Sequence, residues 1–330
     1  MDALIQNGID WILAIQALGG WLELPMKFFT FLGHENFFFL VLPLIYWSLD
    51  ARLGLQVAFI LATSNYVNSI VKVLFASPRP FWVSAQVEPL SVESTFGVPS
   101  GHAQNSAAIW GTMAAGAQRA GKRWAWIAAF VIAFLVGFSR LYLGMHFLHD
   151  VVLGWLIGLA LLFLFLRFWD LVAAWLKQKT LLQQVMIAFG ISLVMIAVGL
   201  LSSAPFSAYV FPAEWANNAL RVGPIPDPVS IEGIFTSAGS LFGLAAGAAW
   251  IASRGGFQAT GPVEQRALRY VIGLIGVMLL WYGLGKGFPR GETVLPLVLR
   301  YIRYALVGFW ITAGAPWLFF HFKLVRQPKM

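Results

Sequence analysis

Long blocks of hydrophobic residues alternate with short polar connectors along most of the chain. The blocks approach the roughly 20 residues that a helix needs to cross a bilayer. They predict an all-α, polytopic transmembrane helix bundle with nine spans, over residues 35–50, 52–76, 101–118, 123–141, 146–168, 181–203, 231–253, 267–287 and 294–320. The stretch 9–32 mixes polar residues and proline with aromatics, which is typical of an interfacial amphipathic segment, and it is the place where a tenth span would fit.

The composition agrees with a membrane protein. Of the 330 residues, 59% are hydrophobic and only 11% are charged, and the mean hydropathy is +0.75. A soluble chain of this length would need more polar surface to cover its core. We predict an N-terminal interfacial segment over 1–34, a core over 35–170 that carries the polar clusters described below, and additional C-terminal transmembrane helices over 171–330.

The net charge of +8 would suggest a nucleic-acid partner in a soluble protein. Here most basic residues gather in alternate connectors, such as 119–123 and 177–179, which the positive-inside rule places in the cytoplasm. We therefore expect no nucleic-acid partner, and we expect the connector 77–100 to face the periplasm, the exterior or a lumen. The default location is a bacterial inner membrane, with an endomembrane as the alternative. The chain has no cysteine, which excludes disulfides and thiolate metal sites.

The first of three polar clusters lies where the second predicted span ends. Asn65, Asn68 and Lys72 follow one another at helical spacing and share one face. Arg79 comes directly after Pro78, which stops the helix. A lone lysine at the end of a span is usually an interface anchor, whereas the polar face beside it favours a site inside the bundle.

The second cluster is Pro99-Ser100-Gly101-His102, directly before an apolar run. Ser100 suits a helix N-cap, and Gly101 permits a close approach of the backbone. The N-terminus of a helix offers free N–H groups and the positive end of a dipole to an anion. A simple capped helix explains the serine and the glycine but gives no reason for His102.

The third cluster runs from Ser139 to Asp150. Arg140 ends one predicted span, and His146 begins the next. His146 and Asp150 are four residues apart and share a helix face, so the carboxylate can fix the imidazole tautomer and leave the other ring nitrogen as a nucleophile or base. A structural histidine pair at the membrane interface, with His149 as its second member, is the alternative.

The predicted topology puts all three clusters on the same membrane face. Their lysine, arginines and helix-end N–H groups can bind a tetrahedral phosphate dianion. Their histidines and aspartate can supply nucleophilic attack and proton transfer. No acidic cluster for Mg²⁺ and no zinc ligand set accompanies them in the sequence, so we expect a site without a metal or a cofactor.

These clusters resemble a known signature. Lys72-x6-Arg79-Pro80, Pro99-Ser100-Gly101-His102 and Ser139-Arg140-x5-His146-x3-Asp150 are similar, in order and in spacing, to the three-part motif of the type 2 phosphatidic acid phosphatase (PAP2) superfamily. Every position of the motif is filled, and the resemblance covers residues 52–168.

The resemblance implies a role for each signature residue. His146 would attack phosphorus, Asp150 would orient it, and His102 would protonate the leaving alkoxide and later activate water. The remaining residues would hold the phosphate and stabilise its transition state: Lys72, Arg79, Ser100, Gly101 and Arg140. The nine-span layout is also similar, more weakly, to the glucose-6-phosphatase and sphingosine-1-phosphate phosphatase branches of the superfamily.

The leading functional hypothesis is a metal-independent phosphatase that acts on a phosphorylated lipid through a phosphohistidine. Candidate substrates are phosphatidic acid, phosphatidylglycerol phosphate, an isoprenyl diphosphate, a sphingoid phosphate and a sugar phosphate. A phosphotransferase with a lipid or glycan acceptor is the alternative. A transporter is disfavoured because the ionisable residues cluster at one rim, and the complete signature disfavours an inactive scaffold. Arg300 and Arg303 could bind a second phosphate or a head group, although interface anchoring, or pairing with Glu or Asp from the outer loops, is the simpler explanation. The sequence leaves the oligomeric state open.

Overall fold

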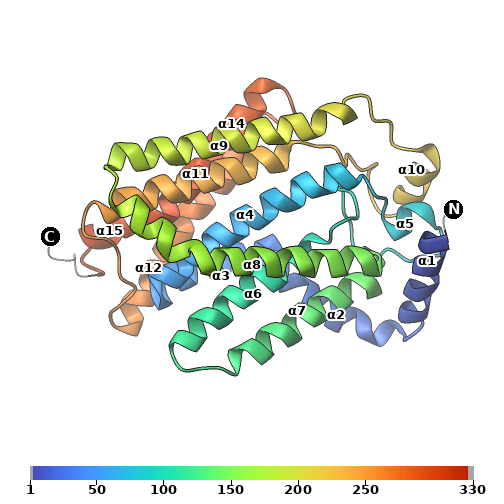
Figure 1. Cartoon of the computed structure of the whole chain (residues 1–330), viewed down its shortest axis with the longest axis horizontal. Helices are drawn as coiled ribbons and strands as arrows, with labels where there is room; N and C mark the ends of the chain where they lie inside the picture. Colours follow the sequence, from blue (N-terminus) through green and yellow to red (C-terminus); the bar gives the residue numbers. More distant parts are fainter. Residues whose placement is uncertain (1–2, 326–330) are drawn as a thin grey trace. The chain divides into compact units, whose positions relative to one another are not determined.

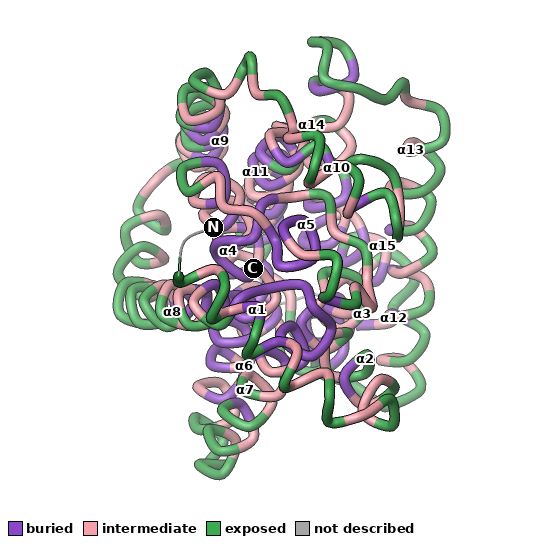
Figure 2. Tube along the Cα trace, turned by 90° about the vertical axis from the view of Figure 1, so that its right-hand side faces the viewer, coloured by how far each residue is buried: buried purple, intermediate pink, exposed green. Residues whose placement is uncertain are grey.

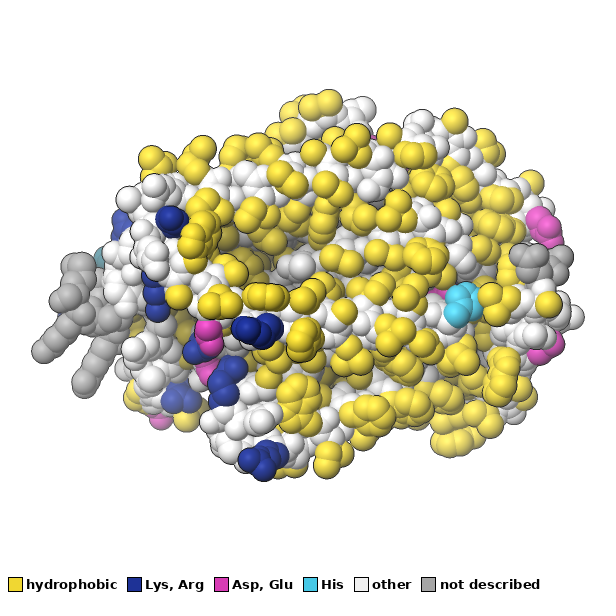
Figure 3. All heavy atoms as spheres, in the orientation of Figure 1, with side chains coloured by type: hydrophobic (Ala, Val, Ile, Leu, Met, Phe, Trp, Pro, Cys, Tyr) yellow, Lys and Arg dark blue, Asp and Glu magenta, His cyan; other side chains and the backbone are white. Residues whose placement is uncertain are grey.

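The computed structural model describes residues 3–325, and helices account for all of its regular structure, because no strand occurs in that range. The predicted all-α class is therefore confirmed. The visible face in Figure 3 is covered largely by hydrophobic side chains, as expected for helices that contact lipid.

Seven helical runs are long and apolar enough to cross a membrane, and an eighth is added if a pair bent by 50°, Gly20–Phe31 with Glu35–Leu49, forms one span. The prediction of nine spans is thus not confirmed. The seven are Ala51–Val83, Ala125–Tyr142, Leu148–Lys177, Leu181–Phe206, Glu232–Ala252, Val263–Gly287 and Val294–His321.

The difference arises at two of the predicted spans. Helix α6 (Gly101–Arg119) covers the span predicted over 101–118 and is long enough, but it is too polar to qualify. Its Gln104, Asn105 and Ser106 are buried inside the protein. The segment 35–50 forms α3 (Glu35–Leu44) and a π-helical turn, and it qualifies only as half of the bent pair.

The chain forms two compact units. Unit 1 comprises residues 1–37, 67–163 and 200–230, and unit 2 comprises 38–66, 164–199 and 231–330. The predicted domain boundaries after residues 34 and 170 stay predictions. Figure 1 labels the helices; besides those given above they are α1 (Ala3–Gln16), α2 (Glu23–Phe31), α4 (Ala51–Phe75), α5 (Pro80–Val83), α7 (Ala125–Tyr142), α8 (Leu148–Lys177), α9 (Leu181–Ser203), α10 (Ala213–Ala219), α11 (Glu232–Ala252), α12 (Val263–Met278), α13 (Leu284–Gly287), α14 (Val294–Phe309) and α15 (Ala315–His321).

Connectors build much of the core of unit 1. Trp82 of α5 is fully buried against the rings of Phe96, Phe211 and Trp215. The Asn218 amide donates to the carbonyl of Trp82 at 2.9 Å, which ties the connector 204–230 to α5. Figure 2 shows α5 as buried. Burial of large aromatic side chains on both connectors holds them in fixed positions around the polar clusters.

Glycines bring α8 against the start of α6 within unit 1. A Cβ atom at Gly154 would lie 2.6 Å from the carbonyl oxygen of Ser100, and one at Gly158 would collide with the carbonyl oxygen of Gln104. Only glycine permits this approach. The glycine pair therefore packs within one chain, and it sets the position of the α6 N-terminus relative to α8.

Candidate active site

Arg79 lies at the centre of the polar cluster of unit 1. Its guanidinium is fully buried and donates hydrogen bonds to the carbonyls of Thr95 at 2.6 Å, Met145 at 3.0 Å and Phe96 at 3.2 Å. Pro80 starts α5 directly after it, so the backbone around Arg79 is extended and the side chain can turn inward. These bonds fix the orientation of the guanidinium before any ligand arrives.

His146 lies between Arg79 and Asp150. Its Nε2 is 3.2 Å from an Arg79 nitrogen, and its Nδ1 is 3.2 Å from Asp150 Oδ2. A guanidinium can only donate, so Nε2 is the acceptor and Nδ1 carries the proton that Asp150 accepts. The same carboxylate oxygen accepts the backbone N–H of Phe147 at 2.9 Å, which holds it in place. The imidazole therefore presents the lone pair of Nε2 to a cationic site.

Ser100 and Gly101 form the beginning of α6. The Ser100 hydroxyl accepts the N–H of Ala103 at 3.4 Å, as an N-cap, and the Ser100 N–H donates to the Asp150 carbonyl at 2.9 Å. A Cβ atom at Gly101 would lie 3.1 Å from the Asn68 amide oxygen, so the backbone approaches α4 closely here. The helix N-terminus thus reaches the same site as His146.

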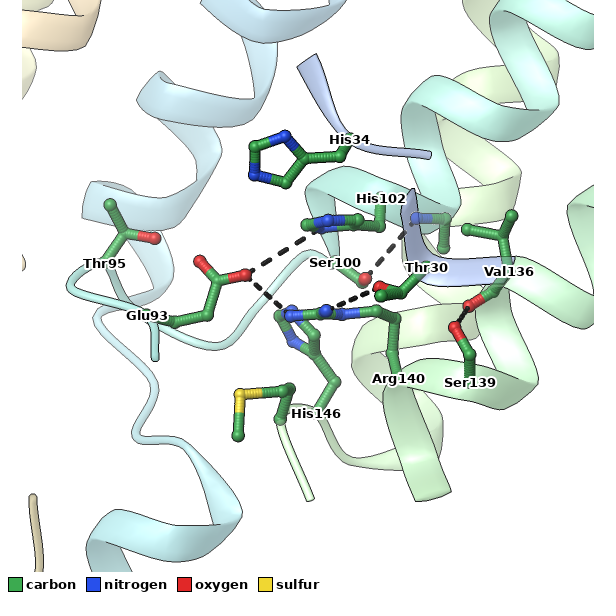
Figure 4. Close-up of polar contacts among 12 residues, drawn as sticks. Thr30, His34, Glu93, Thr95, Ser100, His102, Val136, Ser139, Arg140 and His146 are labelled. Carbon is green, nitrogen blue, oxygen red and sulfur yellow. Dashed lines mark hydrogen bonds and ion pairs between the residues drawn. The ribbon is translucent and has the colours of Figure 1, made fainter. Parts of the chain in front are cut away.

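Arg140 and His102 both face the Glu93 carboxylate (Figure 4). Arg140 is buried and donates to the Thr30 hydroxyl at 2.7 Å, and its other terminal nitrogen lies 2.6 Å from the Glu93 carboxylate. His102 Nδ1 is 3.9 Å from the same Glu93 oxygen. Within the described part of the chain, His102 Nε2 is buried without a hydrogen-bond partner. That nitrogen is available to a ligand.

Lys72 reaches the site from α4. Its ammonium donates to the carbonyl of Phe96, which also accepts from Arg79. Asn68, one turn earlier, donates to the Pro99 carbonyl at 3.3 Å and to the Gln104 amide at 3.0 Å. The polar face predicted from the sequence therefore looks into the protein, toward the connector that precedes α6.

Glu93 is the functional residue that the sequence analysis missed. Its carboxylate lies 2.6 Å from Arg140, 3.6 Å from Arg79 and 3.9 Å from His102, so it lies where the two guanidinium groups and the His102 imidazole converge. It comes from the irregular connector 84–100, where no periodicity indicates which side chain points inward. Charge balance could have indicated it, because the predicted site had two arginines and a lysine but only one carboxylate, and buried cations need a carboxylate partner.

The surroundings lower the pKa values of Glu93 and His146, which both lie outside the candidate spans. Burial alone would raise the pKa of Glu93, but the neighbouring Arg79 and Arg140 overcome that effect and hold its pKa well below the usual range. Burial, together with the nearby Arg79, Arg140 and Lys72, lowers the pKa of His146 well below its ordinary value. Glu93 is thus an anion, and His146 is a neutral imidazole at neutral pH.

The structure brings all eight sequence-predicted residues together in unit 1. His149, which is outside the signature, lies beside the site, with Nε2 3.1 Å from Asp150 Oδ1. Among residues 3–325, no group of three or more His, Cys, Asp or Glu side chains is arranged to hold a metal ion. The arrangement can bind one anion between several cations and offer it an imidazole nitrogen.

Comparison with known proteins agrees with this site. The model of the PAP2 superfamily matches residues 53–173, and that of the "PAP2 superfamily phosphatase, transmembrane extension" matches residues 235–327. Phosphatidylglycerophosphatase B of Bacillus subtilis (strain 168) is 34% identical over 157 residues, which are 44% of this chain and 73% of that protein. The fold and site define a membrane-integral phosphatase, and the chain belongs to the PAP2 superfamily.

Two further matches differ in how much of their own length they share with this chain. Human glucose-6-phosphatase 3 is 33% identical over 185 residues, which are 49% of this chain and 53% of that protein, so the match spans about half of this relative. A crystal structure described as a transmembrane PAP2 type phosphatidylglycerolphosphate phosphatase from Bacillus subtilis aligns with a TM-score of 0.45 and 29% identity, over 52% of this chain and 88% of that chain.

Proposed function

We propose that this protein hydrolyses a phosphate ester or diphosphate of a membrane lipid through a phosphohistidine formed on His146. The observation that carries the proposal is the orientation of the imidazole. Asp150 accepts the Nδ1 proton, and the Nε2 lone pair faces Arg79 in a site lined by further cations. A neutral, oriented imidazole beside an anion-binding wall is what nucleophilic attack on a phosphoryl group requires.

In the first step, Nε2 of His146 attacks phosphorus and the bond from phosphorus to the ester oxygen breaks. The bound phosphate dianion favours the protonated form of the neighbouring His102 ring, and this imidazolium donates a proton to the departing alkoxide. Asp150 stabilises the positive charge that develops on the His146 ring. Arg79, Arg140 and Lys72 neutralise the equatorial oxygens, and the N–H groups at the start of α6 assist them.

In the second step, water attacks phosphorus and the bond between phosphorus and nitrogen breaks. His102, now neutral, takes the proton of the water, and His146 returns to its neutral form. One water is consumed, and one phosphate and one alcohol are released. The Nε2 of His102 supports this role, because it is buried without a hydrogen-bond partner among the described residues and can therefore exchange a proton with a ligand.

A lipid substrate has more support than a sugar phosphate. Of the two sequence relatives described above, the phosphatidylglycerophosphatase is covered more fully, over 73% of its length against 53% for glucose-6-phosphatase 3. Exposed apolar side chains also lie next to the site, since Phe31 follows the Thr30 that binds Arg140, and Leu148 lies two residues after His146. The similarity to glucose-6-phosphatase 3 favours a sugar phosphate as the second candidate. The distribution of basic connectors supports a site on the non-cytoplasmic face.

Phosphate release from a substrate panel tests the proposal. Purified protein in detergent should hydrolyse phosphatidic acid, phosphatidylglycerol phosphate or an isoprenyl diphosphate with a kcat/KM at least about tenfold above that for glucose 6-phosphate. Only a lipid can bury its chains against the exposed apolar side chains beside the site. Glucose 6-phosphate as the best substrate would overturn the lipid assignment. Turnover that requires an added alcohol acceptor would favour the phosphotransferase.

Glu93→Gln is expected to strengthen inhibition by vanadate, with the inhibition constant falling about three- to tenfold. The carboxylate competes with an anionic ligand for Arg140 and Arg79, and the amide removes that competition while keeping the shape of the side chain. The measurement is the dependence of phosphate release on vanadate concentration.

Glu88→Gln is the matched control, because Glu88 is exposed in the same connector. Its vanadate inhibition constant should equal that of the unmodified protein. Unchanged or weaker inhibition in Glu93→Gln would show that Glu93 does not occupy the anion site.

A further inference from the structure

Unit 2 contains a polar cavity, separate in sequence from the signature residues. It has a volume of about 590 Å³ and lies between α14 and the segment formed by the π-helical turn Leu279–Gly283 and α13. This volume falls in the range of small-molecule sites. The cavity belongs to the C-terminal region for which the proposed phosphatase mechanism has no use.

The lining of this cavity is strongly basic. It includes Lys286, Arg290, Arg300 and Arg303 against a single acidic residue, Glu232, which gives the lining a formal net charge of +3. Arg300 is paired with Glu232 and also donates to the Thr236 hydroxyl at 3.2 Å. The other three cations are therefore left without a carboxylate in the lining, and an anion would complete the cavity.

Aromatic rings hold two of these cations without neutralising them. The Lys286 ammonium lies 4.6 Å from the centre of the Tyr282 ring, and the Arg303 guanidinium lies 4.9 Å from that of Tyr304. Trp281 donates to the Tyr304 hydroxyl at 3.3 Å, which fixes that ring. Within residues 3–325, Arg303 Nε is buried without a hydrogen-bond partner. These contacts hold the cationic side chains in position around the cavity before a ligand binds.

An apolar groove continues from this cavity. It has a volume of about 390 Å³, is lined by Val271, Leu274, Ile275 and Met278 of α12, and shares Tyr282 with the basic cavity. The connector 288–293 joins two candidate spans, so the basic cavity lies where the helices leave the apolar part of a membrane. A charged cavity at this level beside a hydrophobic groove fits an amphipathic ligand with an anionic head.

We propose that this cavity binds the phosphate of an anionic phospholipid, with an acyl chain in the adjoining groove. Inorganic phosphate has the same head chemistry but cannot use the groove. The proposed role of the site is binding rather than catalysis, because its lining has no histidine that could repeat the attack proposed for His146.

Lipid retention by purified protein tests the proposal. Detergent-solubilised protein is incubated with equal amounts of phosphatidylglycerol and phosphatidylcholine, and the bound lipids are measured by native mass spectrometry. Phosphatidylglycerol is a phosphodiester and has no terminal phosphoryl group to be hydrolysed. Lys286→Gln/Arg290→Gln should reduce the preference for phosphatidylglycerol about tenfold, because two cations near an anionic head group are lost. Both residues are exposed, so the fold should tolerate the change.

Lys122→Gln/Arg123→Gln is the matched control, since it removes one exposed lysine and one exposed arginine from the connector between α6 and α7. Its preference for phosphatidylglycerol should equal that of the unmodified protein. Equal loss in both double variants, or no loss in either, would overturn the proposal. Inorganic phosphate that displaces phosphatidylglycerol at equal concentration would also overturn it, because the site would then recognise a free anion.

Discussion

His146→Ala is expected to reduce phosphate release by at least about 10,000-fold while the protein stays folded. This imidazole presents the Nε2 lone pair to the Arg79 guanidinium and is oriented by the Asp150 carboxylate. Removal of a nucleophile from a covalent mechanism leaves only the binding of the phosphate. The measurement is single-turnover phosphate release, together with the thermal unfolding midpoint in detergent.

Trapping gives an independent test of the same step. Protein quenched in base after mixing with a ³²P-labelled substrate should carry acid-labile label, and His146→Ala should carry none. His321→Ala is the matched control, because His321 is exposed at the end of α15 and should leave both the label and turnover unchanged. Turnover of His146→Ala above about a tenth of the original rate would remove the phosphohistidine mechanism.

Asp150→Asn is expected to lower kcat about 1,000- to 10,000-fold with a smaller change in KM. The amide can donate to Nδ1, which favours the tautomer with the proton on Nε2. In that tautomer Nε2 has no lone pair with which to attack phosphorus. It also loses the charge that stabilises the imidazolium. The measurement is steady-state kinetics on the lipid phosphate that the substrate panel identifies.

Asp170→Asn provides the same substitution on the same helix. Asp170 is largely exposed and pairs with Arg52 at 2.5 Å, away from any signature residue. Its kcat should stay within about twofold of the original, as expected for a surface ion pair. A comparable loss in both variants, or a normal kcat in Asp150→Asn, would contradict the proposed role of the Asp150–His146 pair.

Long apolar runs could be predicted accurately from the sequence. The run over 294–320 predicts a helix that the structure extends over Val294–His321, and the run over 181–203 corresponds to α9. The position of Asn68 and Lys72 on one face of α4 could also be predicted from helical spacing. His146 and Asp150 do meet, but the predicted shared helix face was wrong, because His146 lies in the irregular stretch before α8 begins at Leu148.

Helix α6 and Glu93 show where such reasoning stops. The polar side chains of α6 face other parts of the protein, and average hydropathy cannot distinguish protein neighbours from lipid. The position of Glu93 depends on the path of an irregular connector, which is fixed by remote contacts such as the packing around Trp82. Sequence spacing contains no record of those contacts.

The Glu93 carboxylate gives the proposed phosphatase the character of an ion exchanger. Its guanidinium groups are already stripped of water and balanced by a built-in counter-ion before any lipid arrives. An incoming phosphate therefore swaps one anion for another, and the driving force is the difference between a dianion and a carboxylate rather than the full attraction of the cations. The reverse exchange, in which Glu93 pairs again with the arginines, would displace inorganic phosphate, so that this side chain would limit inhibition by the product.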